Sequence, residues 1–148
     1  MVDKLAEDLN NLSRADAAYL DYAAVFNTVN HDLILNKLKN NFGIDANSSQ
    51  NLKSYLQDRQ QQVVISGPVS DSLPVFSGLP QGSILEPLLF AWFINDISER
   101  FSDGTELVMY ADDTGIWREI VGDNDQFILQ KDIDNFFNWS ITNKMQLP

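Results

Sequence analysis

The sequence contains no cysteine and only one histidine, His31. Without cysteine no disulfide can form, which favours an intracellular protein, in the nucleus or the cytoplasm. Structural zinc sites are built from cysteine and histidine, so any metal bound here would have the oxygen ligands that magnesium, manganese and calcium prefer. His31 and Asp32 form a pair seen in metal phosphohydrolases, but that chemistry requires further histidines, and the chain has none.

Basic residues are also scarce, with 10 lysines and arginines against 21 acidic residues and a net charge of −11. Clustered lysine and arginine provide most of the affinity for a phosphate backbone. We therefore expect this chain alone to bind nucleic acid weakly. A nucleic-acid function would need basic surface from elsewhere, or bound cations.

Long apolar runs are absent too. The longest, residues 88–94, is far shorter than the roughly 20 residues that span a bilayer. The first eight residues lack the apolar core of a signal peptide, so we expect no membrane association. The 148 residues, of which 44% are hydrophobic, are enough for one globular domain.

Two adjacent carboxylates, Asp112 and Asp113, stand between two short apolar runs in residues 107–117. Aspartate is depleted in strands and favoured in turns, so this pattern predicts a hairpin with the two aspartates at its bend. The flanks are apolar on consecutive residues, which predicts strands covered on both faces. Charges at the tip of a buried hairpin are costly unless water or a cation compensates them. Such a pair alone is also typical of a solvated turn.

Asp21 is the only charge in residues 17–26, which we interpret as a buried strand ending near Tyr22 and followed by a turn. A lone aspartate there is either a hydrogen-bonded structural residue or part of a site. Residues 77–83 form a loop with two glycines and a proline. Glycines permit close approach of a ligand to the backbone, although such loops are often mere connectors.

The remaining pattern predicts alternating helices and strands. We expect helices over 5–12, 33–42, about 49–56, 84–101 and from 123–125 to 137, and strands over 63–65, 73–76 and from 144 to 147. Asp32 and either Ser48 or Ser49 are the expected N-caps, and Pro87 is tolerable only in a first turn. The acidic cluster at 123–125 lacks the glycine and glutamate of a calcium loop and is interpreted as capping. This order predicts an α+β fold, an antiparallel sheet with helices packed on one face.

Three segments in this order resemble the palm of a reverse transcriptase, an RNA-directed DNA polymerase. They are residues 19–32, 77–96 and 110–114, and the resemblance extends over about 17–147. The type it resembles is that of the non-LTR retrotransposons, the jockey-like and long-interspersed-element group. The resemblance implies an RNA template, a DNA primer and a deoxynucleoside triphosphate as partners.

The resemblance also implies a catalytic centre. Nucleotidyl transfer needs two divalent ions about 3.5–4 Å apart. By resemblance, Asp21 and Asp112 are the principal ligands of two Mg²⁺ ions, with Asp113 supporting and Mn²⁺ as a possible substitute. Such a centre would account for two aspartates at a hairpin bend.

Substrate-binding residues are implied in the same way. Phe26 matches the bulky position that crowds a ribose 2′-hydroxyl, with ordinary core packing as the alternative. Gln81 and Gly82 match the loop that lies against the incoming nucleotide and template. Tyr22 and Tyr110, beside the aspartates, complete the expected substrate-binding set.

The chain departs from the family pattern beside these motifs. Ala24 stands where a lysine is common, Asn27 where aspartate is usual and Glu86 where glycine is usual. We interpret residues 1–148 as one partial domain, a palm with part of the fingers around 43–76 and no thumb. Two hypotheses follow: magnesium-dependent, RNA-templated DNA synthesis, or a catalytically silent remnant that acts as a binding or structural module.

Overall fold

The computed structural model describes residues 14–22, 24–110 and 113–146. Its contacts divide the chain into two compact units. The sheet unit comprises Met1–Val25 and Asn95–Pro148, and the helical unit comprises Phe26–Ile94. The helix expected over 5–12 lies outside the described residues.

The sheet unit is built on three antiparallel strands in the order β1-β5-β4. They are β1 (Ala15–Asp21), β4 (Thr105–Tyr110) and β5 (Asp113–Glu119). β4 and β5 pair as the two arms of the predicted hairpin, with Tyr110 opposite Asp113. Central strand β5 is buried from Thr114 to Trp117, whereas β4 is only partly covered. The predicted α+β class with an antiparallel sheet is thus confirmed.

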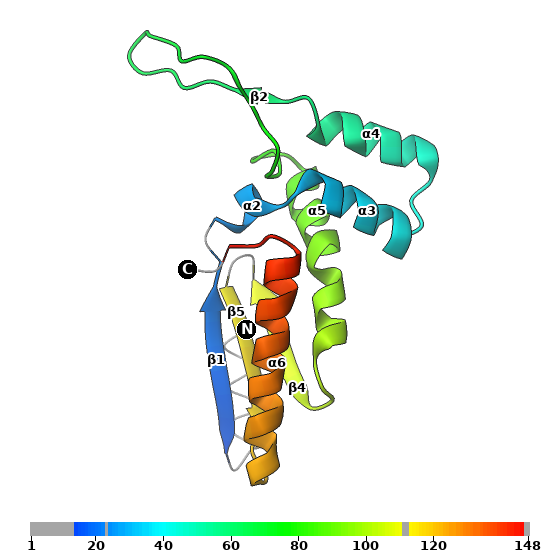
Figure 1. The fold of residues 1–148 in the computed structure, drawn as a ribbon, viewed down its shortest axis with the longest axis vertical. Coiled ribbons are helices and arrows are strands. Elements are labelled where there is room, and N and C mark those ends of the chain that lie inside the picture. The colour runs from blue at the N-terminus through cyan, green and yellow to red at the C-terminus, as the bar shows by residue number, and fades with distance from the viewer. Residues whose placement is uncertain (1–13, 23, 111–112, 147–148) are drawn as a thin grey trace. The chain divides into compact units, whose positions relative to one another are not determined.

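One long helix, α6 (Asp123–Thr142), runs along one face of this sheet (Figure 1). Its buried positions include Leu129, Phe136 and Trp139, whose spacing places them on one side of a helix. The Asp125 carboxylate accepts hydrogen bonds from the Gly122 N–H at 3.0 Å and the Val121 N–H at 3.1 Å. The predicted capping role of the acidic cluster is confirmed.

The strand expected from 144 to 147 is wrong for residues 144–146, and Leu147 lies outside the described residues. Lys144 has a left-handed backbone, with φ of 58°, and its N–H donates to the Ile141 carbonyl at 3.1 Å. The Met145 N–H donates to the Ser140 carbonyl at 2.9 Å. These bonds close the end of α6, so the two amides are already occupied and cannot pair with a strand.

The helical unit contains α3 (His31–Asn41), α4 (Ala46–Leu56) and α5 (Leu85–Ile94). It also contains α2 (Val25–Thr28) except for its first residue, Val25, which belongs to the sheet unit. The expected N-caps are wrong. Asn30 caps α3 by accepting from the Leu33 N–H, and Asp45 caps α4 by accepting from the Ser48 N–H. Both helices begin earlier than predicted, because an asparagine or aspartate with extended backbone stands closer to the free amides of the first turn.

The helix expected over 84–101 is shorter. After Ile94 the chain continues as a 3₁₀ helix, η1 (Asn95–Arg100). Asparagine and aspartate are weak helix formers, which explains the change at Asn95 and Asp96. Pro87 lies in the first turn of α5, as predicted. Only Leu89, Phe90 and Phe93 are buried, so α5 is covered on one side rather than all round.

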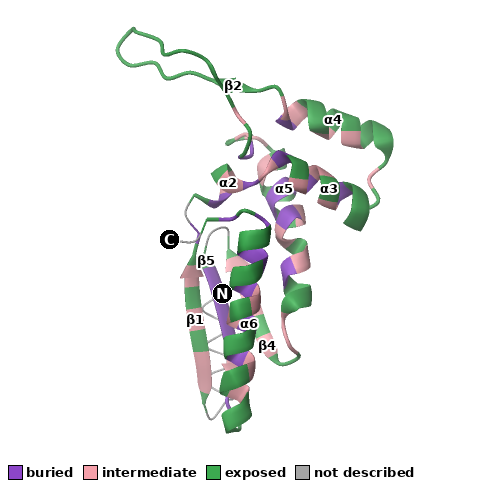
Figure 2. Ribbon diagram, in the orientation of Figure 1, coloured by how far each residue is buried: buried purple, intermediate pink, exposed green. Residues whose placement is uncertain are grey.

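The strand expected over 73–76 is shorter, since β3 covers only Leu73–Pro74, and its partner β2 (Gln60–Gln61) lies outside the expected strands. Residues 63–65 form no strand beyond an isolated bridge between Val64 and Val69. The whole segment 58–74 is exposed (Figure 2). β-branched residues stabilise strands mainly through packing, and an isolated hairpin has no sheet or helix to pack against.

Candidate functional site

Asp21 and Asp113 lie directly opposite each other on paired strands. Asp21 ends β1, Asp113 begins β5, and Tyr110 of β4 is the next partner across the sheet. Cross-strand partners point to the same face, so the three side chains share one face, and all three are exposed. The expectation that Asp21 is buried is wrong, because β1 is an edge strand whose residues 17, 19 and 21 are exposed.

This carboxylate face is the one that α6 does not cover. On the opposite face, Arg118 Nε of β5 donates to Asp125 Oδ1 of α6 at 3.0 Å. Arg118 is an odd number of positions from Asp113, so the two side chains point to opposite faces. A pocket of about 280 Å³ lies beside the two carboxylates and is lined by Tyr19, Leu20, Asp21, Asp113 and Thr114.

The opposed carboxylates suit a divalent cation. Like charges directly opposite on paired strands destabilise a sheet, and within the described residues no lysine or arginine forms an ion pair with Asp21 or Asp113. Carboxylate oxygens are the ligands that Mg²⁺ and Mn²⁺ prefer. Within residues 14–22, 24–110 and 113–146, the structure brings together no group of three or more Asp, Glu, His or Cys side chains that could hold a metal ion. The third expected ligand, Asp112, lies outside the described residues.

Tyr22 points away from this face. Its side chain is 2% exposed, and its ring centroid lies 5.4 Å from that of Phe136 in α6. The Tyr22 hydroxyl lies 2.7 Å from Ser140 Oγ, which donates its own proton to the Phe136 carbonyl at 2.8 Å, so Tyr22 is the donor. Burial raises the pKa of Tyr22 to about 12, and the Ser140 bond offsets this only partly. In this arrangement the Tyr22 side chain is part of the core rather than of the exposed surface.

The predicted substrate loop belongs to the helical unit and is tied to the segment that follows Phe26. The Leu79 N–H donates to the Phe26 carbonyl and the Gly78 N–H to the Val29 carbonyl, both at 2.8 Å. Buried His31 bonds through Nε2 to the Gly78 carbonyl at 2.8 Å. Gly78 has φ of 91°, and a Cβ there would meet the Asn27 backbone at 3.1 Å. This close approach requires glycine.

Phe26 is half-buried, with its ring centroid 4.9 Å from that of Phe90 in α5. Gln81 and Gly82 are both exposed. A cavity of about 590 Å³ adjoins the loop, lined by Asn27, Arg59, Gln61, Gln81 and residues 74–80. The structure therefore brings Phe26, Gln81 and Gly82 into one unit, and Asp21, Tyr110 and Asp113 into the other.

Sequence reasoning assigned no role to Tyr19, Asn27 or Glu86. Tyr19 is 65% exposed and shares the carboxylate face, a position signalled by its distance of two residues from Asp21. Asn27 contacts Gln81 and Glu86 contacts Gly82, whereas the sequence marks both only as departures from a family pattern. No local signal in the sequence reveals those contacts.

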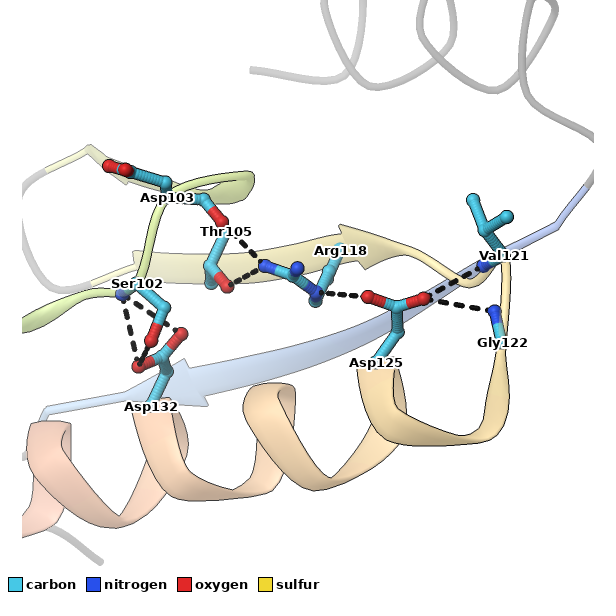
Figure 3. A network of polar contacts seen from close by, with 8 residues as sticks. All are labelled: Ser102, Asp103, Thr105, Arg118, Val121, Gly122, Asp125 and Asp132. Carbon is cyan, nitrogen blue, oxygen red and sulfur yellow. Dashed lines mark hydrogen bonds and ion pairs between the residues drawn. The ribbon is translucent and has the colours of Figure 1, made fainter.

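A polar network supports the hairpin from the α6 side (Figure 3). Besides its bond to Asp125, Arg118 donates through Nη1 to the Asp103 carbonyl at 2.8 Å. Asp132 is fully buried in α6 and accepts from the Ser102 N–H at 3.1 Å and the Ser102 hydroxyl at 3.0 Å. The network joins α6 to β5 and to the segment that leads into β4.

Residues 7–148 match the family model described as reverse transcriptase (RNA-dependent DNA polymerase). The chain belongs to the reverse transcriptase family. The matched range includes every predicted site residue, although it assigns no role to any of them.

Relatives of this reverse transcriptase chain occur in mobile elements. It is 31% identical over 122 residues to the RNA-directed DNA polymerase from mobile element jockey of Drosophila melanogaster, covering 78% of this chain and 13% of that protein. It is 34% identical over 107 residues to the probable RNA-directed DNA polymerase from transposon BS of the same species, covering 68% and 12%. The Pol polyprotein from type-1 retrotransposable element R2 of Popillia japonica is 30% identical over 84 residues, covering 57% and 14%.

These matches confirm the predicted resemblance to jockey-like enzymes of non-LTR retrotransposons. The chain spans only 12–14% of the length of these three relatives. No helix in the described part of the chain is long and apolar enough to cross a membrane.

Proposed function

We propose that this chain is the palm of an RNA-directed DNA polymerase, which adds deoxynucleotides to the 3′-hydroxyl of a DNA primer on an RNA template. One observation carries the proposal: Asp21 and Asp113 are register partners on the sheet face opposite α6. Asp112 precedes Asp113 directly in the chain. Membership of the reverse transcriptase family and similarity to jockey support the same conclusion.

Asp21, Asp112 and Asp113 would together hold two divalent ions, Mg²⁺ or in its place Mn²⁺. The chemistry that such ions would supply is activation of the primer hydroxyl and stabilisation of the charge of the triphosphate. The chain's own task is to keep the carboxylates in a fixed arrangement. Asp21 and Asp113 suit this task because they belong to paired strands backed by α6, and sites on strands are held more accurately than sites on loops.

The helical unit would select the substrate. In this proposal the exposed part of the Phe26 ring lies beside the sugar, and Gln81 and Gly82 contact the incoming nucleotide and template. Tyr110, 76% exposed beside Asp113, would contact the primer or nucleotide on the carboxylate face. Tyr22 would contribute through its backbone alone.

A second candidate function is a catalytically silent remnant that acts as a binding or structural module. β1 and β4 are both edge strands of the described sheet. An unpaired edge can accept a strand from a partner protein. Asn27 and Glu86, where the family has other residues, favour this candidate as well.

A chimeric polymerase distinguishes the two candidates. This chain replaces the matching segment of the jockey polymerase, and magnesium-dependent extension of a DNA primer on an RNA template is measured. We expect synthesis that falls to background in Asp21→Asn and persists in Asp71→Asn, which removes an exposed carboxylate from the helical unit. A chimera that folds but makes no DNA would favour the silent remnant.

A further inference from the structure

The polar groups of the substrate loop that would meet a nucleotide are already hydrogen-bonded within the chain. Gln81 Nε2 donates to Asn27 Oδ1 at 2.9 Å. The Gly82 N–H donates to Glu86 Oε2 at 2.8 Å. A ligand that takes up either donor must first replace an internal acceptor.

The Glu86 carboxylate acts at the start of α5. Ser83 Oγ accepts from the Glu86 N–H at 3.1 Å, while the Glu86 side chain reaches back to Gly82. This reciprocal arrangement resembles a capping box, displaced by one residue. It also places a negative charge where the backbone amides and dipole of a helix would otherwise attract an anion.

The base of the loop is held separately. Gly78 and Leu79 are fixed to residues 26–31 by backbone bonds and by His31. The contacts at the base are backbone–backbone bonds or buried. The bonds from Gln81 to Asn27 and from Gly82 to Glu86 each use a side-chain acceptor and are exposed to solvent. Exposed bonds exchange with water at little net cost. The turn at Gln81 and Gly82 can therefore open while its base stays in place.

We propose that Asn27 and Glu86 are positioning residues that form a latch, holding the Gln81–Gly82 turn closed, and that nucleotide binding requires the latch to open. The inference rests on the proposed function, because it takes this turn as the nucleotide contact. Asn27 accepts the hydrogen bond of the Gln81 side chain, and Glu86 accepts that of the Gly82 backbone N–H. Glu86 also repels the triphosphate, so removing its charge favours the nucleotide even where its hydrogen bond is kept.

The test uses the full 148-residue chain labelled with ¹⁵N. Hydrogen exchange of the Gly82 amide is measured first, and a deoxynucleoside triphosphate with magnesium is then titrated while the Gly82 resonance is followed. The variants are Asn27→Ala, Glu86→Ala and Glu86→Gln, since glutamine can keep the capping bond without the charge. Asn36→Ala and Asp71→Asn are matched controls at exposed positions of the helical unit.

We expect the Gly82 amide hydrogen to exchange about fivefold faster in Glu86→Ala, because that factor corresponds to the loss of one hydrogen bond. In Glu86→Gln the amide should stay protected from exchange. Nucleotide affinity should rise about fivefold in Asn27→Ala and Glu86→Ala, rise less in Glu86→Gln, and stay unchanged in both controls. The rise in Glu86→Gln, without faster exchange, separates the effect of charge from loss of structure.

Unchanged Gly82 exchange in Glu86→Ala would overturn the inference. So would equal or weaker nucleotide binding in the latch variants, because the bonds would then support the binding conformation. Both results leave the proposed function intact. No nucleotide-dependent shift in any variant would instead overturn the nucleotide role of this turn, and the inference with it.

Discussion

At the scale of single residues, Phe26 has the most specific proposed task. Its ring packs against Phe90, yet the residue is only half-buried. In the proposed function, its exposed part would meet the sugar of the nucleotide. Its carbonyl accepts the Leu79 N–H, which links Phe26 to the loop that carries Gln81. In the proposed function, sugar selection and the position of this loop would therefore depend on the same residue.

We expect Phe26→Val in the chimeric polymerase to admit ribonucleotides. The smaller side chain opens space beside the 2′-hydroxyl, and the preference for deoxynucleotides should fall by about tenfold or more. The measurement compares incorporation of the two sugars by parent and variant. Phe42→Val, which removes a phenylalanine that contacts Trp92, is the matched control. Equal discrimination in Phe26→Val and the parent would reduce Phe26 to core packing.

Residue chemistry predicted some of the site but not all of it. The position of Asp113 at the hairpin and the capping by Asp125 depend on local preferences, so the sequence sufficed. The orientation of Tyr22 depends on Ser140, 118 residues further along the chain, which no local pattern reveals. The contacts of Gln81 with Asn27 likewise join distant residues.

At the scale of elements, α6 and its first turn support the sheet. Arg118 of β5 and the amides of Val121 and Gly122 all bond to Asp125, which couples the start of the helix to the central strand. Asp132, two turns further on, holds Ser102. The hairpin is thereby positioned from one side, while Asp113 lies on the other face.

Acid should weaken this coupling. Hydrogen bonds from the Gly122 N–H, from Arg118 and from the Val121 N–H hold the pKa of Asp125 below its usual value. The stabilisation is therefore complete above the unfolded pKa of about 3.9 and is lost as pH falls through the lower folded pKa. Urea unfolding at pH 7 and pH 3 should show that the free energy of unfolding falls more in the parent than in Asp125→Asn. An equal fall in the free energy of unfolding in the parent and in Asp125→Asn would contradict this prediction. Asp123→Asn is the control and should lose as much as the parent.

Asp132 offers a second check on the same element. Asp132→Ala leaves the Ser102 N–H without its acceptor, which should cost about 1–3 kcal/mol in the free energy of unfolding. Asp132→Asn keeps an acceptor oxygen and should cost less. Urea unfolding measures both, and an Ala variant as stable as the parent would show that water replaces the carboxylate.

The elements themselves were predictable where packing agrees with local preference. The apolar stripe of α6 meets partners within the sheet unit, so sequence and structure coincide for that helix. Residues 63–65 have the composition of a strand but remain exposed, since no described element packs on them. Propensity without a packing partner predicts the wrong structure there.

At the scale of the whole molecule, charge limits what the chain does alone. With a net charge of −11 it should repel a primer–template except where magnesium screens the charges. Phosphoryl transfer depends on how the reactants are positioned as well as on metal ions. The three relatives named above are much longer, since the matched part of the chain covers only 12–14% of their length.

We therefore expect no primer extension by the isolated chain, with either magnesium or manganese, on an RNA template. Asp112→Asn serves as the control for a contaminating polymerase, because contamination would persist in the variant. Template-dependent synthesis that disappears in Asp112→Asn would contradict this expectation and show that the chain is a working polymerase by itself.

The most direct test of the central claim is the effect of magnesium and manganese on the melting temperature of the chain. An ion bound only by the folded state raises that temperature. We predict a rise at millimolar concentrations that is largely lost in Asp21→Asn and in Asp112→Asn, and kept in Asp123→Asn. A rise that is unchanged in the first two variants, or lost only in Asp123→Asn, would place the ion elsewhere and contradict the account.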